Sequence, residues 1–94
     1  MAIKQISRGD FSQLVHNKSL IYSLAGHPDE WYADEAGNIL GFLGECRMPS
    51  KWFYCVLQRG DAGNFLIIEI KPKLESHDVA KTELCKAMEE AGQI

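Results

Sequence analysis

Thiols and imidazoles are the groups of this chain that could do nucleophilic or acid–base chemistry. The thiols belong to Cys46, Cys55 and Cys85, and the imidazoles to His16, His27 and His77. No cysteine and histidine stand at a spacing that predicts a catalytic dyad. Cys46 is the one thiol whose neighbour, Arg47, could lower its pKa. The alternative hypothesis is therefore a thiol-dependent enzyme or small-ligand-binding domain using Cys46, although an ordinary loop thiol is favoured.

The sequence predicts neither a disulfide framework nor a metal site. The three cysteines are odd in number and widely spaced, and no Cys-x-x-Cys pair occurs. Asp29, Glu30, Asp34 and Glu35 lack the spacing of an oxygen-ligand loop and are interpreted as a solvated acidic patch. We expect reduced thiols, no cofactor, no catalytic residue and no enzymatic activity of the chain's own.

The charge balance argues against nucleic-acid binding. The formal net charge is −3, the sequence pI is about 5.5, and the ten Lys and Arg residues are scattered along the chain. Aromatic side chains could stack bases, but no basic groove is predicted to hold a phosphate backbone. The opening Met-Ala-Ile-Lys-Gln-Ile has no apolar run of signal-peptide length, and no segment approaches the ~20 apolar residues that span a bilayer. We expect a cytoplasmic protein with no membrane partner.

Two short segments repeat a turn pattern. Residues 34–40 and 60–66 share Ala-Gly-Asn followed by an apolar pair. Asp34 and Gly37 suit the first and fourth positions of a type I turn with a left-handed residue, and Gly63 supplies the same position in the second copy. The repeat therefore predicts two β-hairpin tips.

The remaining elements follow from apolar patterning and from capping residues. Strands are predicted at 30–34, 38–45, 51–59 and 65–71, with a loop at 46–50 and a ladder that ends at Pro72. Apolar residues at helical spacing predict a helix at 76–91, capped by Ser76 and ended by a left-handed Gly92. Near the other terminus, Asp10 could cap a short helix that brings Phe11, Leu14 and Val15 together, and 19–24 could continue it or form a strand.

We therefore expect one α+β domain over residues 1–94. It is an antiparallel β-meander of about four strands with a C-terminal helix and a short N-terminal helix. If Gly60 faces Asn64, Val56 faces Ile68 and Tyr54 faces Ile70. The predicted core face of this hairpin is Trp52, Tyr54, Val56, Leu66, Ile68 and Ile70.

The other face of the same hairpin is also apolar, which is more than a half-solvated hairpin requires. Its candidate interface residues are Phe53, Leu57, Phe65 and Ile67. Either a partner covers them, or Phe11, Leu14 and Val15 cover them from within the chain.

Several of these residues resemble a family pattern. The pattern consists of Glu30-Trp31-Tyr32-Ala33-Asp34, then Gly37, Leu40 and Gly41, then Trp52-x-Tyr54-x-Val56-Leu57 and the Gly63 tip. It resembles a group of short bacterial proteins with no assigned activity, over roughly residues 29–71. The chain departs from the group's pattern at Lys51 and at Gln58-Arg59-Gly60. The resemblance implies a shared hairpin architecture and carries over no catalytic or binding residue.

The working hypothesis is a small non-catalytic protein-interaction module. A chain of 94 residues buries a modest fraction of its surface, so self-association is a common way to hide additional apolar side chains. The expected partner is a second copy of the chain or another protein, bound at the second apolar face or at the edge of the sheet.

Overall fold

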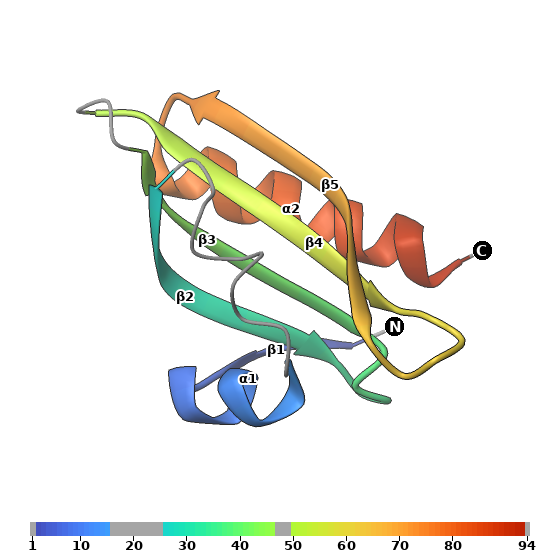
Figure 1. The fold of residues 1–94 in the computed structure, drawn as a ribbon. Coiled ribbons are helices and arrows are strands. Elements are labelled where there is room, and N and C mark those ends of the chain that lie inside the picture. The colour runs from blue at the N-terminus through green and yellow to red at the C-terminus, as the bar shows by residue number, and fades with distance from the viewer. Residues whose placement is uncertain (1, 16–25, 47–49, 94) are drawn as a thin grey trace.

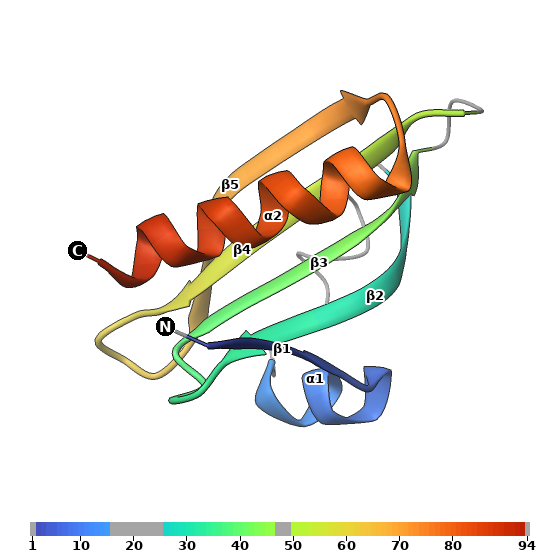
Figure 2. The same cartoon turned by 180° about the vertical axis from the view of Figure 1, so that it is seen from behind.

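Five strands form one antiparallel sheet in the computed structural model, which describes residues 2–15, 26–46 and 50–93 (Figure 1). The strands run in chain order as β1 (Ile3–Ile6), β2 (Gly26–Asp34), β3 (Ile39–Cys46), β4 (Trp52–Arg59) and β5 (Phe65–Leu74). Helix α1 (Arg8–Leu14) covers one face, and helix α2 (His77–Gly92) crosses the other (Figures 1 and 2). The predicted α+β meander is confirmed, but it has five strands because residues 3–6 add an edge strand to β2. Within the described ranges, no helix is long and apolar enough to cross a membrane.

Both predicted hairpin tips are confirmed. The Gly37 N–H donates to the Asp34 carbonyl oxygen at 3.2 Å, and Gly37 is left-handed with φ of 73°. In the second tip the Gly63 N–H donates to the Gly60 carbonyl at 3.0 Å, and Gly63 has φ of 86°. The buried Asp34 carboxylate also accepts the Asn38 N–H at 2.9 Å. An Asp side chain that accepts a backbone N–H within its own turn stabilises that turn, so Asp34 fixes the first tip.

Arg59 joins the two tips. Its Nε donates to Asn38 Oδ1 at 3.2 Å, and its two Nη atoms donate to the carbonyls of Gly37 and Gly63 at 3.2 Å and 3.3 Å. The guanidinium also lies 4.7 Å from the centroid of the Phe65 ring. The two segments that share Ala-Gly-Asn therefore lie side by side, held by a single side chain.

A β-bulge corrects the predicted register of the β4–β5 hairpin. The Gly60 N–H donates to the Asn64 carbonyl at 2.8 Å, as predicted, and Leu57 faces Ile67. The register then shifts by one residue, so that Val56 faces Glu69. The extra residue of such a bulge is left without a partner in the ladder.

The bulge changes which side chains reach the core. Tyr54 faces Lys71 in place of the predicted Ile70. Leu66 lies before the bulge and faces Gln58, as the predicted register has it, so its exposure does not come from the bulge. Leu66, Ile68 and Ile70 are 59%, 46% and 39% exposed, so the prediction that they belong to the core is wrong. Alternation along a strand assigns faces only while the register is regular.

Strand β5 also continues past Pro72, where the ladder was expected to end. A second irregularity lies between the pairs Tyr54–Lys71 and Trp52–Leu74. Lys73 is left-handed there, with φ of 64°. Pro72 is tolerated because β5 is an edge strand, where one side of the backbone needs no ladder donor.

Helix α2 packs closely on β3 and β4. The Ser76 hydroxyl accepts the Val79 N–H at 3.2 Å, which confirms the predicted N-cap. Gly92 remains helical and Gln93 is the C-cap with φ of −88°, so the predicted left-handed ending at Gly92 is wrong. A Cβ on Gly41 would lie 2.7 Å from the Met88 sulfur. The absence of a side chain at Gly41 therefore lets α2 approach the sheet.

Helix α1 begins one turn earlier than predicted. Its N-cap is Ser7, whose hydroxyl accepts the Asp10 N–H at 3.0 Å, so the expected cap at Asp10 is wrong. Phe11 and Val15 are buried against the sheet, which agrees with the alternative that the chain covers this face itself, and Leu14 is partly buried. Residues 19–24, expected to continue the helix or to form a strand, lie outside the described residues.

Candidate functional site

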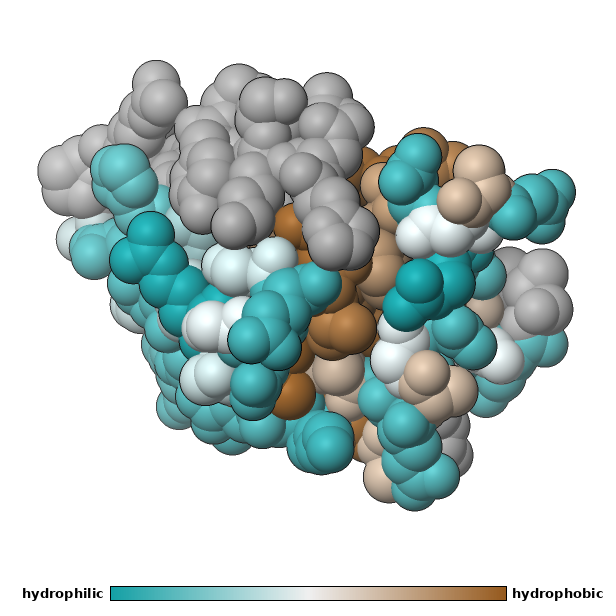
Figure 3. Space-filling view, turned by 60° about the horizontal axis from the view of Figure 1, so that its bottom comes forward, coloured by the Kyte–Doolittle hydropathy of each residue, from teal (hydrophilic) through white to brown (hydrophobic). Residues whose placement is uncertain are grey.

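The four candidate interface residues meet on the α1 face of the sheet. Phe53, Leu57 and Phe65 are buried, and Ile67 is partly exposed and packs against them. Phe11 and Val15 belong to the same cluster, so they contribute to covering this face from within the chain. Figure 3 shows hydrophobic side chains in a strip between α1 and the β4–β5 hairpin. Of the four residues, Ile67 is the one that retains surface for a partner.

Aromatic rings interlock in this cluster. The ring centroids of Phe11 and Phe42 are 5.8 Å apart with planes at 85°, and those of Phe42 and Phe53 are 6.0 Å apart at 79°. Edge-to-face contacts of this geometry are favourable beyond the area they bury. Phe53 is therefore part of the hydrophobic core on the α1 face.

The exposed aliphatic side chains of the sheet gather on β5 instead. We define the β5 edge surface as Leu66, Ile68 and Ile70, which lie along the edge strand but not on one face: Leu66 faces Gln58 on the α2 side, and Ile70 faces Cys55 on the α1 side. Strand β5 is at one end of the sheet, and no strand of the described chain pairs with its outer edge (Figure 1). Unpaired backbone groups beside apolar side chains form a template for strand pairing.

The other sheet edge is protected. Strand β1 has four residues, and its two central side chains, Lys4 and Gln5, are exposed. Short edge strands and edge lysines both disfavour pairing with another chain. The second half of β5 is protected in the same way by Lys71, Pro72 and the left-handed Lys73. The first half of β5 has no lysine or proline, and its edge is interrupted by the bulge at Ile68.

A hydrogen-bonded cluster connects β2 to the start of α2. The Tyr32 hydroxyl donates to one oxygen of Glu30 at 2.5 Å, and His77 Nε2 bonds the other oxygen. Trp52 contacts the His77 ring edge-on, with centroids 5.2 Å apart. His77 Nδ1 also lies 3.4 Å from Asp78 Oδ1.

These contacts set the protonation of the cluster. The Glu30 hydrogen bond raises the pKa of His77 more than burial lowers it. Burial raises the pKa of Glu30, but hydrogen bonds from Tyr32 and His77 outweigh it and the net shift is downward. A carboxylate–imidazole pair could relay a proton, yet no thiol or hydroxyl nucleophile of the described residues is hydrogen-bonded to His77. The arrangement fastens α2 to β2 through a carboxylate–imidazole contact, which is an ion pair while His77 is protonated.

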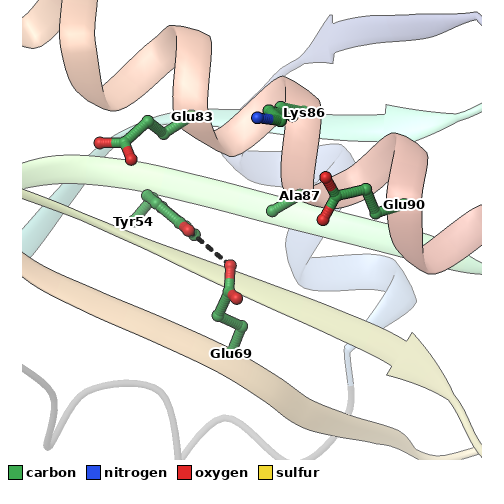
Figure 4. A pocket seen from close by; sticks show the side chains of 6 residues that line it. All are labelled: Tyr54, Glu69, Glu83, Lys86, Ala87 and Glu90. Atoms are coloured by element: carbon green, nitrogen blue, oxygen red, sulfur yellow. Dashed lines mark hydrogen bonds between the residues drawn. The ribbon is translucent and has the colours of Figure 1, made fainter.

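A hollow on the opposite flank of α2 has a volume of about 170 Å³ (Figure 4). Its lining residues are Tyr54, Glu69, Glu83, Lys86, Ala87 and Glu90. The Tyr54 hydroxyl donates to Glu69 Oε2 at 2.5 Å, and burial together with this carboxylate raises the pKa of Tyr54. Lys71 bonds Glu83 at 2.7 Å across the gap between β5 and α2. These bonds position α2 beside β5.

The thiols do not form a reactive centre in the described part of the chain. Burial raises the pKa of Cys55 to about 12 and also raises the pKa of Cys85, which makes both weak nucleophiles at neutral pH. Cys46 is partly exposed at the end of β3, and its N–H donates to the Lys51 carbonyl at 2.7 Å. Arg47, on which the hypothesis of an activated Cys46 depends, lies outside the described residues, as does His16. His27 is exposed in β2.

The acidic residues near the first tip have separate structural tasks. Asp34 is buried and caps the turn, and Glu30 binds Tyr32 and His77, so the predicted solvated patch is wrong for both. Asp29 and Glu35 are exposed, as expected. Among the described residues, no group of His, Cys, Asp and Glu side chains is arranged to hold a metal ion.

Comparison of the chain with protein-family models, with curated proteins and with solved structures finds no match. Sequence reasoning missed the exposure of Ile68 and Ile70 because it assumed an unbroken register. The sequence signal that could have indicated an edge strand is Lys71-Pro72-Lys73, since lysines and proline protect sheet edges.

Proposed function

We propose that the protein is a small non-catalytic interaction module that receives an extended apolar segment of its partner as a further strand on β5. The observation that carries the proposal is the exposure of Leu66, Ile68 and Ile70 on the edge strand, at 59%, 46% and 39%. Strand addition gains main-chain hydrogen bonds from the unpaired edge, and alternate side chains supply selectivity. The bound segment would run along β5 from Phe65 to Ile70.

Neighbouring surfaces support this location. The buried residues of the α1 face, Phe53 above all, are already packed against α1, so a partner cannot reach them without opening the fold. Ile67 lies partly exposed within the same β5 segment. The bound strand would therefore adjoin the apolar strip of Figure 3 on one side of the sheet.

The compartment and the family remain proposals from the sequence. We propose a cytoplasmic location, and the free thiols of Cys46, Cys55 and Cys85 suit a reducing compartment. We also propose kinship with the group of short bacterial proteins that share the Glu30–Asp34 motif. That kinship brings no activity to the chain.

The test uses a capped peptide of alternating valine and threonine as an extended apolar probe. Its addition should shift the backbone amide NMR signals of residues 65–70 and leave those of β1 unchanged. Ile68→Lys should abolish the shifts, because an edge lysine disfavours strand pairing. The matched control is Val79→Lys, since Val79 is 39% exposed but lies on α2. Shifts that survive Ile68→Lys, or that appear elsewhere, would overturn the proposal.

A further inference from the structure

We infer that the segment received by β5 is amphipathic, with aliphatic side chains on the α1 side of the sheet and a basic side chain on the α2 side. This inference rests on the proposed function and names the chemistry of the partner. Three features of β5 lead to it: the difference between its two sides, the position of its bulge and the charges beside it.

The two sides of β5 differ in polarity. On the α1 side its residues are all apolar, namely Phe65, Ile67 and Ile70. On the α2 side its residues include two charges, namely Leu66, Glu69 and Lys71. A strand added to the outer edge places its own alternate side chains on the same two sides. Aliphatic side chains of the partner on the α1 side would contact Ile70, which is 39% exposed, and extend the hydrophobic strip of Figure 3.

The bulge of β5 sets the pattern of the incoming strand. Neighbouring residues of β4 face Ile67 and Glu69, so Ile68 between them has no partner in the ladder. Residues 53–57 of β4 pass this bulge as a regular strand and alternate between the buried clusters of the two faces. An incoming segment that passes Ile68 in the same way needs an unbroken alternation of apolar and polar residues. A second β5 lacks this alternation because of its own bulge, so the partner is a different polypeptide.

The charges beside β5 favour a basic side chain on the α2 side of the partner. Glu69 is exposed and lines the hollow between β5 and α2 together with Glu83, Lys86 and Glu90 (Figure 4). Lys71 bonds Glu83 at 2.7 Å. Among these described groups, three carboxylates stand against the two ammonium groups of Lys71 and Lys86. One negative charge is in excess, and a lysine or arginine of the partner would offset it.

The experiment compares capped peptides that alternate valine with threonine, as in the test of the proposed function. One peptide carries lysine at its central polar position, and a second carries glutamate there. Each is titrated into the full chain, and the amide NMR signals of residues 65–71 give the dissociation constant. The lysine peptide should bind about five-fold more tightly than the glutamate peptide, since opposite charges across strands attract and like charges repel. A lysine peptide of the same composition with valine and threonine in pairs should bind at least about ten-fold more weakly than the alternating one, because it loses the alternation.

Two variants assign the preference to Glu69. Glu69→Gln should reduce the difference between the lysine and glutamate peptides to less than about two-fold, because the amide carries no charge. Its oxygen can still accept the Tyr54 hydroxyl, so the fold should be retained. The matched control is Glu89→Gln, since Glu89 is exposed on α2 and does not line the hollow. It should leave the five-fold preference unchanged, and circular dichroism of both variants checks the fold.

Each other outcome has a defined meaning. If the lysine and glutamate peptides bind equally well, or if the preference survives Glu69→Gln, the basic partner is overturned and the proposed function stands. If the paired sequence binds as well as the alternating one, the amphipathic strand is overturned. A chain that is monomeric in sedimentation equilibrium and binds none of the peptides overturns the proposed function as well. A dimeric chain that excludes every peptide would have a second copy at this edge, which overturns the assignment to a different polypeptide.

Discussion

The two faces of the sheet are closed in different ways. Helix α2 has 16 residues and buries Leu84 and Met88 against β3 and β4, whereas α1 has seven residues and contributes Phe11. The α2 face carries polar bonds along both flanks of its helix, at His77 and at Tyr54. The buried cluster on the α1 face consists of aromatic and aliphatic side chains together with the Cys55 thiol.

This difference separates two ways of fixing a helix on a sheet. Directional bonds position α2, because hydrogen bonds and ion pairs restrict its placement along the sheet. Interlocking rings position α1, because edge-to-face contacts tolerate little displacement. Stability should therefore depend on buried aromatic volume on the α1 face, and on close approach and pH on the α2 face.

Removal of an aromatic ring from the α1 face should have the largest effect. Phe53→Ala should lower the free energy of unfolding by about 3–5 kcal/mol, because Phe53 is fully buried against Phe42. Ile67→Ala, at a partly exposed position of the same face, should cost about 1 kcal/mol. Urea unfolding at one low protein concentration measures both. If Phe53→Ala kept full stability and changed only the solution mass, Phe53 would be an interface residue after all.

A side chain at the closest approach of α2 should have the next largest effect. Gly41→Val should cost about 1–3 kcal/mol, because its Cβ would lie 2.7 Å from the Met88 sulfur and 2.8 Å from Leu84 Cδ1. Gly41→Ala should cost less, since both neighbours are side-chain atoms that can shift. Thermal unfolding followed by circular dichroism checks the order. Equal stability of all three proteins would show that α2 does not depend on this contact.

The sequence predicted the parts of the fold that local chemistry decides. The tips at Gly37 and Gly63 and the cap at Ser76 each depend on residues within a few positions of one another. Strand β1 was missed because its apolar residues, Ile3 and Ile6, are three positions apart and do not alternate.

The candidate site depended on contacts that no local pattern contains. The bulge at Ile68 arises in the apolar run 65–68, in which no polar residue marks the face of each side chain, so the exposed Ile68 and Ile70 could not be separated from the core. Glu30 and His77 are 47 positions apart, and their pairing follows only from the placement of α2 on the sheet. Both findings required the tertiary arrangement.

The smallest predicted effect concerns pH on the α2 face. The pKa of His77 is raised above its ordinary 6.5, so its contribution to stability is complete below pH 6.5 and is lost as the pH rises through the folded-state pKa. The pKa of Glu30 is lowered below its ordinary 4.5, so its contribution is present above pH 4.5 and is lost as the pH falls through the folded-state pKa. The ion pair therefore stabilises the protein most between these two ordinary values.

The free energy of unfolding of His77→Gln should differ from that of the wild-type protein only within this pH window. Near pH 5.5 the variant should be less stable by about 0.5 kcal/mol, a small cost because both side chains are partly exposed and solvent screens the pair. Near pH 9 the two proteins should unfold at similar urea concentrations, since neutral His77 no longer pairs as a cation. His27→Gln, at an exposed histidine, is the matched control and should show no such window. A stability difference that stayed constant from pH 5.5 to pH 9 would mean that the His77 ring acts by packing on Trp52. The two faces of the sheet would then differ in the shape of their packing but not in electrostatics.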